Sequence, residues 1–260
     1  MSIPEAQFAT DGAIAYLTFN RPQARNAMTW AMYDALADAC AHVEAEEQLR
    51  VFVLRANGDA FVAGTDIPQF SAFQSGDDGI AYERRMEEVI AQLERLSVPT
   101  IAQIQGVAAG GGCMIALVCD LRVCTPAAKF GVPIARTVGN CLSAANLARL
   151  VDLIGPARTK ELMVTGRLLD VREADSLGLV TSIASAEEIG GIVRTLAQTI
   201  TAHAPITIRT TKEALRRLAA RRRLAAGEDD DLIAHCYASA DFHEGVAAFL
   251  DKRPPRFTGR

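Results

Sequence analysis

Three consecutive glycines, Gly110, Gly111 and Gly112, limit more than any other feature how this chain can fold. They follow residues 100–105, which are predicted to form a strand, and precede the apolar residues 113–119, which are predicted to form a helix. A glycine turn that opens a helix leaves backbone N–H groups unpaired at the positive end of the helix dipole. Such groups bind a phosphate or a developing oxyanion. A tight turn in which helix and strand pack too closely for a Cβ explains the same glycines equally well.

A second turn of small residues follows the strand predicted at residues 51–54. It runs through Ala63, Gly64, Thr65 and Asp66. Two such turns, each placed after a strand, can supply one N–H group each to a single carbonyl oxygen. The glycine spacing fits neither the phosphate-binding P-loop nor the dinucleotide fingerprint. The two turns together therefore favour an oxyanion site.

Strand and helix patterns alternate along most of the chain. Residues 13–19 are predicted to form a strand, and an apolar stripe at helical spacing begins after Thr29. Alternating strands and helices favour an α/β architecture. The chain becomes mostly helical towards its C-terminus, and Pro205 is the predicted boundary. This divides the chain into an α/β core, residues 1–204, and a C-terminal helical region, residues 205–260.

One further helix is predicted before the glycine turn, at residues 82–96. Its apolar residues, such as Met86 and Ile90, recur on one side, and its glutamates and arginines are expected on the other. The preceding residues, 71–79, are polar and contain glycine, so they are predicted to form a loop.

The composition limits the classes of protein to which the chain can belong. With 260 residues, of which 50% are apolar and 22% charged, it can fold around a large core. A net charge of -4 gives no reason to expect nucleic acid as a partner. The six cysteines show no CxxC pairing, which favours reduced thiols, and the histidines lack metal-site spacing. Neither the N-terminus nor the uncharged stretch 96–119, which proline and glycines interrupt, predicts export or a membrane span, so a cytoplasmic location is expected.

A series of motifs, in order along nearly the whole chain, resembles the enoyl-CoA hydratase/isomerase (crotonase) superfamily. The motifs are Asn20-Arg21-Pro22 with Asn26-Ala27, Phe61-xx-Gly64-x-Asp66-Ile67, Gly106-xxx-Gly110-Gly111-Gly112-Cys113, Cys119-Asp120-Leu121-Arg122, Lys129-Phe130-Gly131-x-Pro133, Leu162-xx-Thr165-Gly166 with Ala174-xxx-Gly178-Leu179-Val180, and Glu244-Gly245-xxx-Phe249-xx-Lys252-Arg253. Each motif alone is modestly specific, whereas the ordered set is highly specific.

The resemblance implies a fold, a ligand and an assembly. The fold is a crotonase-like spiral of ββα units with a C-terminal helical region used in trimerisation, which gives a homotrimer or a dimer of trimers. The ligand is an acyl-CoA thioester, with CoA as part of the substrate and no permanently bound cofactor. By position, Thr65 and Gly111 match the two oxyanion-hole residues. The positions that match CoA-contacting residues are Gln23, Ala24, Arg25, Ala63, Asp66, Ile67, Tyr237 and Lys252.

Two departures from the family pattern bear on the reaction. Hydratases of this family carry glutamates where this chain has Met114 and Ile134. Adding water to an α,β-double bond needs one group to activate the water and one to protonate the α-carbon, and neither a thioether nor a hydrocarbon does either. Loss of one such group costs on the order of 10²- to 10⁴-fold in rate. Ordinary hydration is therefore not expected, and isomerases that depend on the second glutamate are disfavoured for the same reason.

Other residues of the chain can replace the missing glutamates. Asn140 and Cys141 follow the second position closely, and a carboxylate from the helix at 82–96 (Glu83, Glu87 or Glu88) can enter the site. For Cys141, packing at the start of a helix is the favoured interpretation. The sequence thus predicts an acyl-CoA-transforming enzyme that stabilises a thioester enolate or oxyanion. The alternatives are a non-catalytic acyl-CoA-binding member of the family and, with less support, a protease-like hydrolase.

Overall fold

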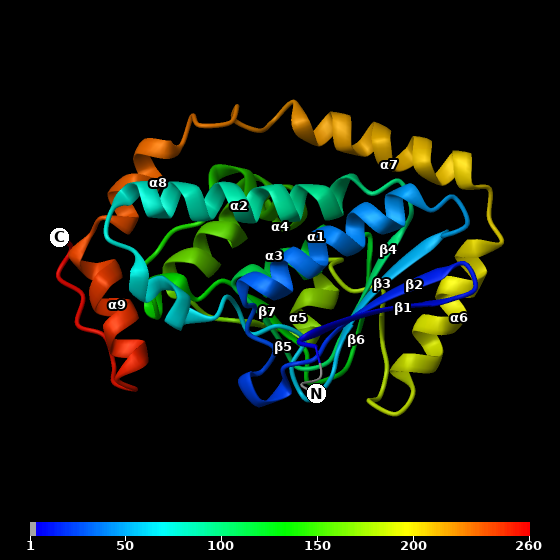
Figure 1. Ribbon diagram of the computed structural model, residues 1–260, viewed down its shortest axis with the longest axis horizontal. Coiled ribbons are helices and arrows are strands. Elements are labelled where there is room, and N and C mark those ends of the chain that lie inside the picture. The colour runs from blue at the N-terminus through cyan, green and yellow to red at the C-terminus, as the bar shows by residue number, and fades with distance from the viewer. Residues whose placement is uncertain (1–3) are drawn as a thin grey trace.

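The structure, a computed structural model, describes residues 4–260, and its largest element is a six-stranded sheet (Figure 1). The strand order is β1-β2-β3-β4-β6-β9, with β1 and β2 antiparallel and the remaining neighbours parallel. A second, three-stranded sheet has the order β5-β7-β8. The strands are β1 Ala6–Asp11, β2 Ile14–Phe19, β3 Val51–Ala56, β4 Thr100–Ile104, β5 Val107–Ala109, β6 Leu121–Cys124, β7 Lys129–Gly131, β8 Leu169–Asp170 and β9 Ser182–Ile183.

Helices cover both faces of the large sheet. They are α1 Trp30–Ala45, α2 Gly76–Arg95, α3 Gly111–Val118, α4 Ala144–Thr165, α5 Val171–Ser176, α6 Ile189–Thr201, α7 Pro205–Ala220, α8 Asp230–Tyr237 and α9 Ala240–Leu250. Three short 3-10 helices also occur, η1 Pro22–Ala24, η2 Ile67–Ala72 and η3 Ile134–Arg136. Within α4, Gly155 has non-helical backbone angles, so α4 consists of two helical stretches that meet at a kink before Pro156.

Strands β2 and β3 are buried on both faces, as the period of two in a strand requires for a sheet between two helical layers. Leu17 and Phe52 point into the main core, which they share with α1, α2 and α3. Tyr16 and Val53 point the other way, onto α6. The α/β fold class and the strands expected near residues 13–19, 51–54 and 100–105 are thereby confirmed.

The loop predicted at residues 71–79 is wrong, because α2 begins at Gly76. Ser75 and Asp78 form a capping box, in which the Asp78 carboxylate accepts from the Ser75 N–H at 2.9 Å. The two glycines that suggested a loop lie where another helix comes close. A Cβ on Gly79 would lie 2.2 Å from the Tyr237 ring of α8.

The C-terminal region folds back onto the core. Helix α7 begins at Pro205, has no buried residue and runs along the edge of the molecule, whereas α8 packs against α2 and α9 against η2 (Figure 1). The division of the chain at residue 205 stays a prediction. Among residues 4–260, no helix combines the length and the apolar content that a membrane crossing needs.

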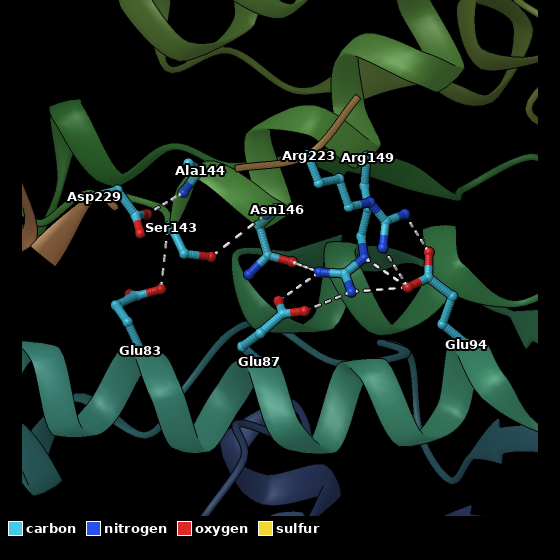
Figure 2. Close-up of polar contacts among 9 residues, drawn as sticks. All are labelled: Glu83, Glu87, Glu94, Ser143, Ala144, Asn146, Arg149, Arg223 and Asp229. Carbon is cyan, nitrogen blue, oxygen red and sulfur yellow. Dashed lines mark hydrogen bonds and ion pairs between the residues drawn. The ribbon is translucent and has the colours of Figure 1, made fainter. Parts of the chain in front are cut away.

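Ion pairs fasten α2 to the segments above it (Figure 2). The buried Arg149 of α4 binds both oxygens of Glu87, at 2.5 and 2.7 Å, and also Glu94, at 2.9 Å. Arg223, which follows α7, makes two hydrogen bonds to the same Glu94. A bidentate pair of this kind fixes orientation as well as distance. It holds α2, α4 and the chain after α7 in one register.

Through its side chain, Asn26 joins the turn around η1 to the loop after β3. Its backbone is left-handed, with φ 55°, which asparagine tolerates better than most residues. The side chain is fully buried, accepts from the Arg21 N–H at 2.7 Å, and donates to the carbonyls of Asn57 and Ala60, each at 2.9 Å.

Replacing Asn26 with alanine removes all three hydrogen bonds, and the buried Ala60 carbonyl, the Asn57 carbonyl and the Arg21 N–H each lose this partner. We expect Asn26→Ala to lower the free energy of unfolding by about 2–4 kcal/mol, measured by urea denaturation. Gln23→Ala, an exposed neighbour, should change it by less than about 0.5 kcal/mol. Equal stabilities of the two variants would contradict this account of Asn26.

Candidate active site

A cavity of about 320 Å³ opens between the turn after β3 and the turn after β5. Helix α2 and the segments around η2 and η3 complete its wall. The wall is mostly apolar, with a few polar groups, as is usual for sites that bind small molecules. The lining residues are Ala24, Arg25, Ala27, Tyr33, Ala63, Gly64, Thr65, Asp66, Ile67, Phe70, Tyr82, Glu83, Met86, Ile90, Ala109, Gly110, Gly111, Met114, Pro133, Ile134, Thr137, Val138, Asn140, Leu142, Asn146 and Phe249.

The two turns meet because glycine leaves room between them. A parallel bridge between Val62 and Ala108 brings the two turns side by side, and a second bridge joins Thr65 to Met28 in the segment before α1. Gly110 has φ 52° and ψ −125°, a conformation reserved for glycine. A Cβ on Gly112 would lie 2.2 Å from the Val62 carbonyl oxygen. The three glycines are therefore consistent with both hypotheses from the sequence, which are close packing of helix and strand and a turn that leaves N–H groups unpaired.

Thr65 and Gly111 present unpaired backbone N–H groups in the wall of this cavity. Gly111 is the first residue of α3, so its N–H has no carbonyl partner within the helix. At the turn after β3, the N–H of Asp66 donates to the Met28 carbonyl, and the N–H of Met28 donates to the Gly64 carbonyl. Within residues 4–260, neither the Thr65 N–H nor the Gly111 N–H donates a hydrogen bond. Two free donors in one cavity wall are suited to hold an oxyanion.

A cluster of hydroxyl groups supports Thr65 from behind. Its Oγ1 is hydrogen bonded to the Tyr33 hydroxyl at 2.8 Å and to the Tyr82 hydroxyl at 2.9 Å. Burial raises the pKa of Tyr33 to about 12 and the pKa of Tyr82 well above its ordinary value. Both phenols therefore stay neutral near pH 7, and Thr65 is fixed without a charge beside the two N–H groups.

The positions that match the family's glutamates lie in the same wall. Met114, on α3, is fully buried, and Ile134, at the start of η3, is 9% exposed. Both line the cavity. Each offers hydrocarbon or thioether surface, so this part of the cavity is apolar.

The residues expected to contact CoA divide into two groups. Ala24, Arg25, Ala63, Asp66 and Ile67 line the cavity, and Gln23 is exposed beside them on η1. Asp66 is paired with Arg21 at 3.1 Å. Lys252 is exposed after α9, and Tyr237 is fully buried behind the cavity wall.

Glu83 is the carboxylate that α2 brings into the cavity. It is 4% exposed and accepts two hydrogen bonds, from the Tyr237 hydroxyl at 2.7 Å and from the Ser143 N–H at 3.2 Å. Figure 2 shows the contact with Ser143. Burial raises the pKa of Glu83 to about 7, against the opposing effect of these donors and with a smaller contribution from the carboxylates of Asp229 and Glu87. The expectation that all glutamates of this helix face away from its apolar side is wrong for Glu83.

The other predicted replacements for the missing glutamates lie differently. Glu87 is bound to Arg149 outside the cavity lining. Cys141 also lies outside the lining, and its hydrogen bond with the Cys236 thiol, together with burial, raises the pKa of Cys141. Asn140 does line the cavity, where its Nδ2 donates to the Tyr237 hydroxyl at 3.0 Å. Its Oδ1 is buried and has no partner among the described residues.

Sequence reasoning missed Tyr33, Tyr82 and Asn146. Tyr33 and Tyr82 come from different helices, so no local pattern joins them to Thr65. Asn146 Oδ1 accepts from Arg149 at 3.0 Å, which turns its Nδ2 away from the arginine (Figure 2). A signal did exist for Glu83, which lies three residues before Met86 and seven before Ile90, on the apolar face of the helix.

No three His, Cys, Asp or Glu side chains in the described part of the chain, residues 4–260, converge so as to hold a metal ion.

Comparison with known proteins relates this arrangement to a family. The model of the family described as enoyl-CoA hydratase/isomerase matches residues 9–260. A probable enoyl-CoA hydratase of Mycobacterium bovis is 32% identical, over 96% of each chain. The mitochondrial enoyl-CoA hydratase domain-containing protein 2 of Bos taurus is 36% identical, over 95% of this chain and 84% of its own. Among solved structures, a methylmalonyl-CoA decarboxylase complexed with 2S-carboxypropyl-CoA is 25% identical and superimposes over all of both chains with a TM-score of 0.89.

The raised pKa of Glu83 predicts a pH-dependent stability. The pKa of Glu83 is about 7 in the folded protein and 4.5 in the unfolded chain. Between pH 4.5 and pH 7 the folded protein therefore binds more protons at this group than the unfolded chain does. The free energy of unfolding therefore falls as pH rises through this window, by about 3 kcal/mol from this group. We expect the stability of Glu83→Gln relative to the native protein to rise by about that amount between pH 4.5 and pH 8.

Denaturant unfolding at several pH values measures this difference. Glu88→Gln is the matched control, because Glu88 is exposed on the same helix and its replacement should leave the pH dependence unchanged. A constant difference between Glu83→Gln and the native protein across the window would show that the carboxyl of Glu83 titrates normally.

Proposed function

Because the chain belongs to the enoyl-CoA hydratase/isomerase family, we propose that it is an enzyme that binds acyl-CoA thioesters and stabilises the thioester enolate or oxyanion on the N–H groups of Thr65 and Gly111. The observation that carries this proposal is the pair of free N–H groups in one wall of the cavity. Donors fixed before the reaction stabilise charge that develops on the thioester oxygen, and they cost no reorganisation when it forms.

The shape and polarity of the cavity support a thioester ligand. Arg25 is exposed at the lining, where a cation suits the phosphates of CoA. Deeper in the cavity, Phe70, Met86, Ile90 and Leu142 supply apolar surface for an acyl group. CoA enters as part of the substrate, and the proposal includes no permanently bound cofactor.

Ordinary hydration is not part of the proposal. Met114 and Ile134 replace the two glutamates of the family's hydratases, and neither side chain can move a proton. The relatives named as hydratases therefore support the ligand class for this chain more than the reaction. A non-catalytic acyl-CoA-binding protein is the second candidate, and the buried, apolar character of these two positions favours it.

The assembly and the location expected from the sequence stay predictions. We propose a homotrimer or a dimer of trimers, since α7 exposes large apolar side chains that an interface would cover. Ile206 is 76% exposed, and Leu215 and Leu218 are about 60% exposed. A cytoplasmic location is also proposed, from the sequence features given above.

We expect purified protein to bind butyryl-CoA, measured by calorimetry, and to hydrate crotonyl-CoA poorly. The absorbance of the conjugated thioester should fall at least about 100-fold more slowly than with a hydratase that carries both glutamates. Hydration at a comparable rate would overturn the proposal about Met114 and Ile134. If no CoA thioester binds, the ligand class itself is wrong.

Gly111→Ala tests the oxyanion site directly. A Cβ at this position would lie 2.5 Å from the Tyr33 hydroxyl, so Tyr33 and the Thr65 it contacts must shift. We expect the rate of deuterium exchange at the α-carbon of a bound acyl-CoA to fall on the order of 10²- to 10³-fold. Gly190→Ala is the control, because a Cβ there meets open space. Equal exchange rates in both variants would contradict the assignment.

A further inference from the structure

Glu83 is a buried carboxyl group without a counter-ion. Within residues 4–260 no arginine, lysine or histidine nitrogen forms an ion pair with it. The cation above α2, Arg149, binds Glu87 and Glu94 instead (Figure 2). Leaving a carboxylate buried with only neutral donors costs folding stability. Such an arrangement, in the wall of a cavity, is typical of a functional group rather than of a structural one.

A structural role for Glu83 also exists and has to be separated from a chemical one. Its Oε2 accepts from the N–H of Ser143, the residue that caps α4. The next N–H, on Ala144, donates to Asp229 at 2.5 Å. The start of α4 is thus held by two carboxylates, and a glutamine at position 83 retains an oxygen that can accept the same hydrogen bond.

The surroundings of Glu83 keep both of its protonation states accessible. Burial raises the pKa of Glu83 to about 7, whereas the hydrogen bond from Tyr237 lowers it. A carboxyl poised near neutral pH can both take up and release a proton. The titratable groups that face it are Tyr237 and Cys236 on α8, Asp229 before α8, Tyr82 and Glu87 on α2, Tyr33 on α1 and Cys141 before α4.

We propose that Glu83 is the catalytic acid/base of this cavity and transfers protons to and from the acyl chain of the bound thioester. The inference rests on the proposed function, because it needs a thioester held at Thr65 and Gly111. In this proposal one carboxyl group, on α2, takes the role of the two glutamates that hydratases of the family carry at positions 114 and 134. The other carboxylate in the lining, Asp66, is paired with Arg21.

The step balances without any co-reactant. A C–H bond next to the thioester carbonyl breaks, its proton goes to a carboxylate oxygen of Glu83, and its electron pair delocalises into an enolate. The enolate oxygen accepts hydrogen bonds from the N–H groups of Thr65 and Gly111. If Glu83 first exchanges this proton with solvent and then protonates the same carbon, the hydrogen of that carbon is exchanged. If Glu83 instead protonates the γ-carbon of a 3-enoyl thioester, the double bond moves into conjugation.

Tyr237 is a positioning residue for this step. Asn140 donates to the Tyr237 hydroxyl, which in turn donates to Glu83. Removal of this donor destabilises the carboxylate, so Tyr237→Phe should raise the pKa of Glu83. The pH at which proton transfer reaches half of its maximum should move upward by the same amount.

The test uses the full-length protein with butyryl-CoA and 3-hexenoyl-CoA in deuterated buffer. Mass spectrometry follows deuterium in the acyl chain, absorbance follows conjugation, and calorimetry measures binding. We expect exchange that rises with pH and levels off above about pH 7. Glu83→Gln should lower it on the order of 10²- to 10⁴-fold with the dissociation constant preserved, and Glu88→Gln should leave it unchanged.

The possible outcomes separate this inference from the proposed function. Binding of both thioesters by the native protein without exchange or conjugation would overturn the role of Glu83 and leave the binding proposal intact. Exchange that persists in Glu83→Gln would do the same. Failure of the native protein to bind either thioester would overturn the proposed function and this inference with it. A shifted pH midpoint in Tyr237→Phe supports a titrating Glu83. An unchanged midpoint contradicts it, because a purely structural role for Glu83 would not move the midpoint.

Discussion

The site depends on the close approach of two backbone turns, after β3 and after β5. The bridge between Val62 and Ala108 joins them, and glycine permits the approach, because Gly110 has φ 52° and a Cβ on Gly112 would collide with the Val62 carbonyl oxygen. The same approach leaves N–H groups facing a cavity instead of a carbonyl. Close packing and an unpaired N–H group therefore both require glycine in this turn. A substitution there would disturb the packing and the N–H groups together.

A second constraint is the distribution of charge along α2. Glu87 and Glu94 form ion pairs with Arg149, and Glu94 forms another with Arg223 (Figure 2). Glu83, in contrast, accepts hydrogen bonds only from neutral donors. Two of the three carboxylates stabilise the contact between helices. The third remains uncompensated and lowers stability at neutral pH. Proteins retain such a cost chiefly where function needs it.

Much of the fold followed from local patterns, because strand alternation and helix stripes report which face is buried. The start of α2 did not, since Gly76 and Gly79 mimic a loop and are explained only by the approach of α8. Within the site, the turn residues could be named from the order of motifs. The environment of Glu83 could not, because Tyr237 and the Ser143 N–H reach it from distant parts of the chain. Glu83 itself was among the candidates named from the sequence, whereas its hydrogen-bond partners were concealed by sequence separation.

The loss of the two glutamates and the burial of Glu83 can be understood as one change. Met114 and Ile134 line the cavity with apolar surface, which neither binds nor activates water. In such surroundings a single carboxyl group keeps a raised pKa, so it can both take up a proton and deliver one to the substrate near neutral pH. A site of this kind favours reactions that return the proton to the substrate over reactions that add water. The apolar substitutions thereby become part of the proposed mechanism instead of a sign of lost activity.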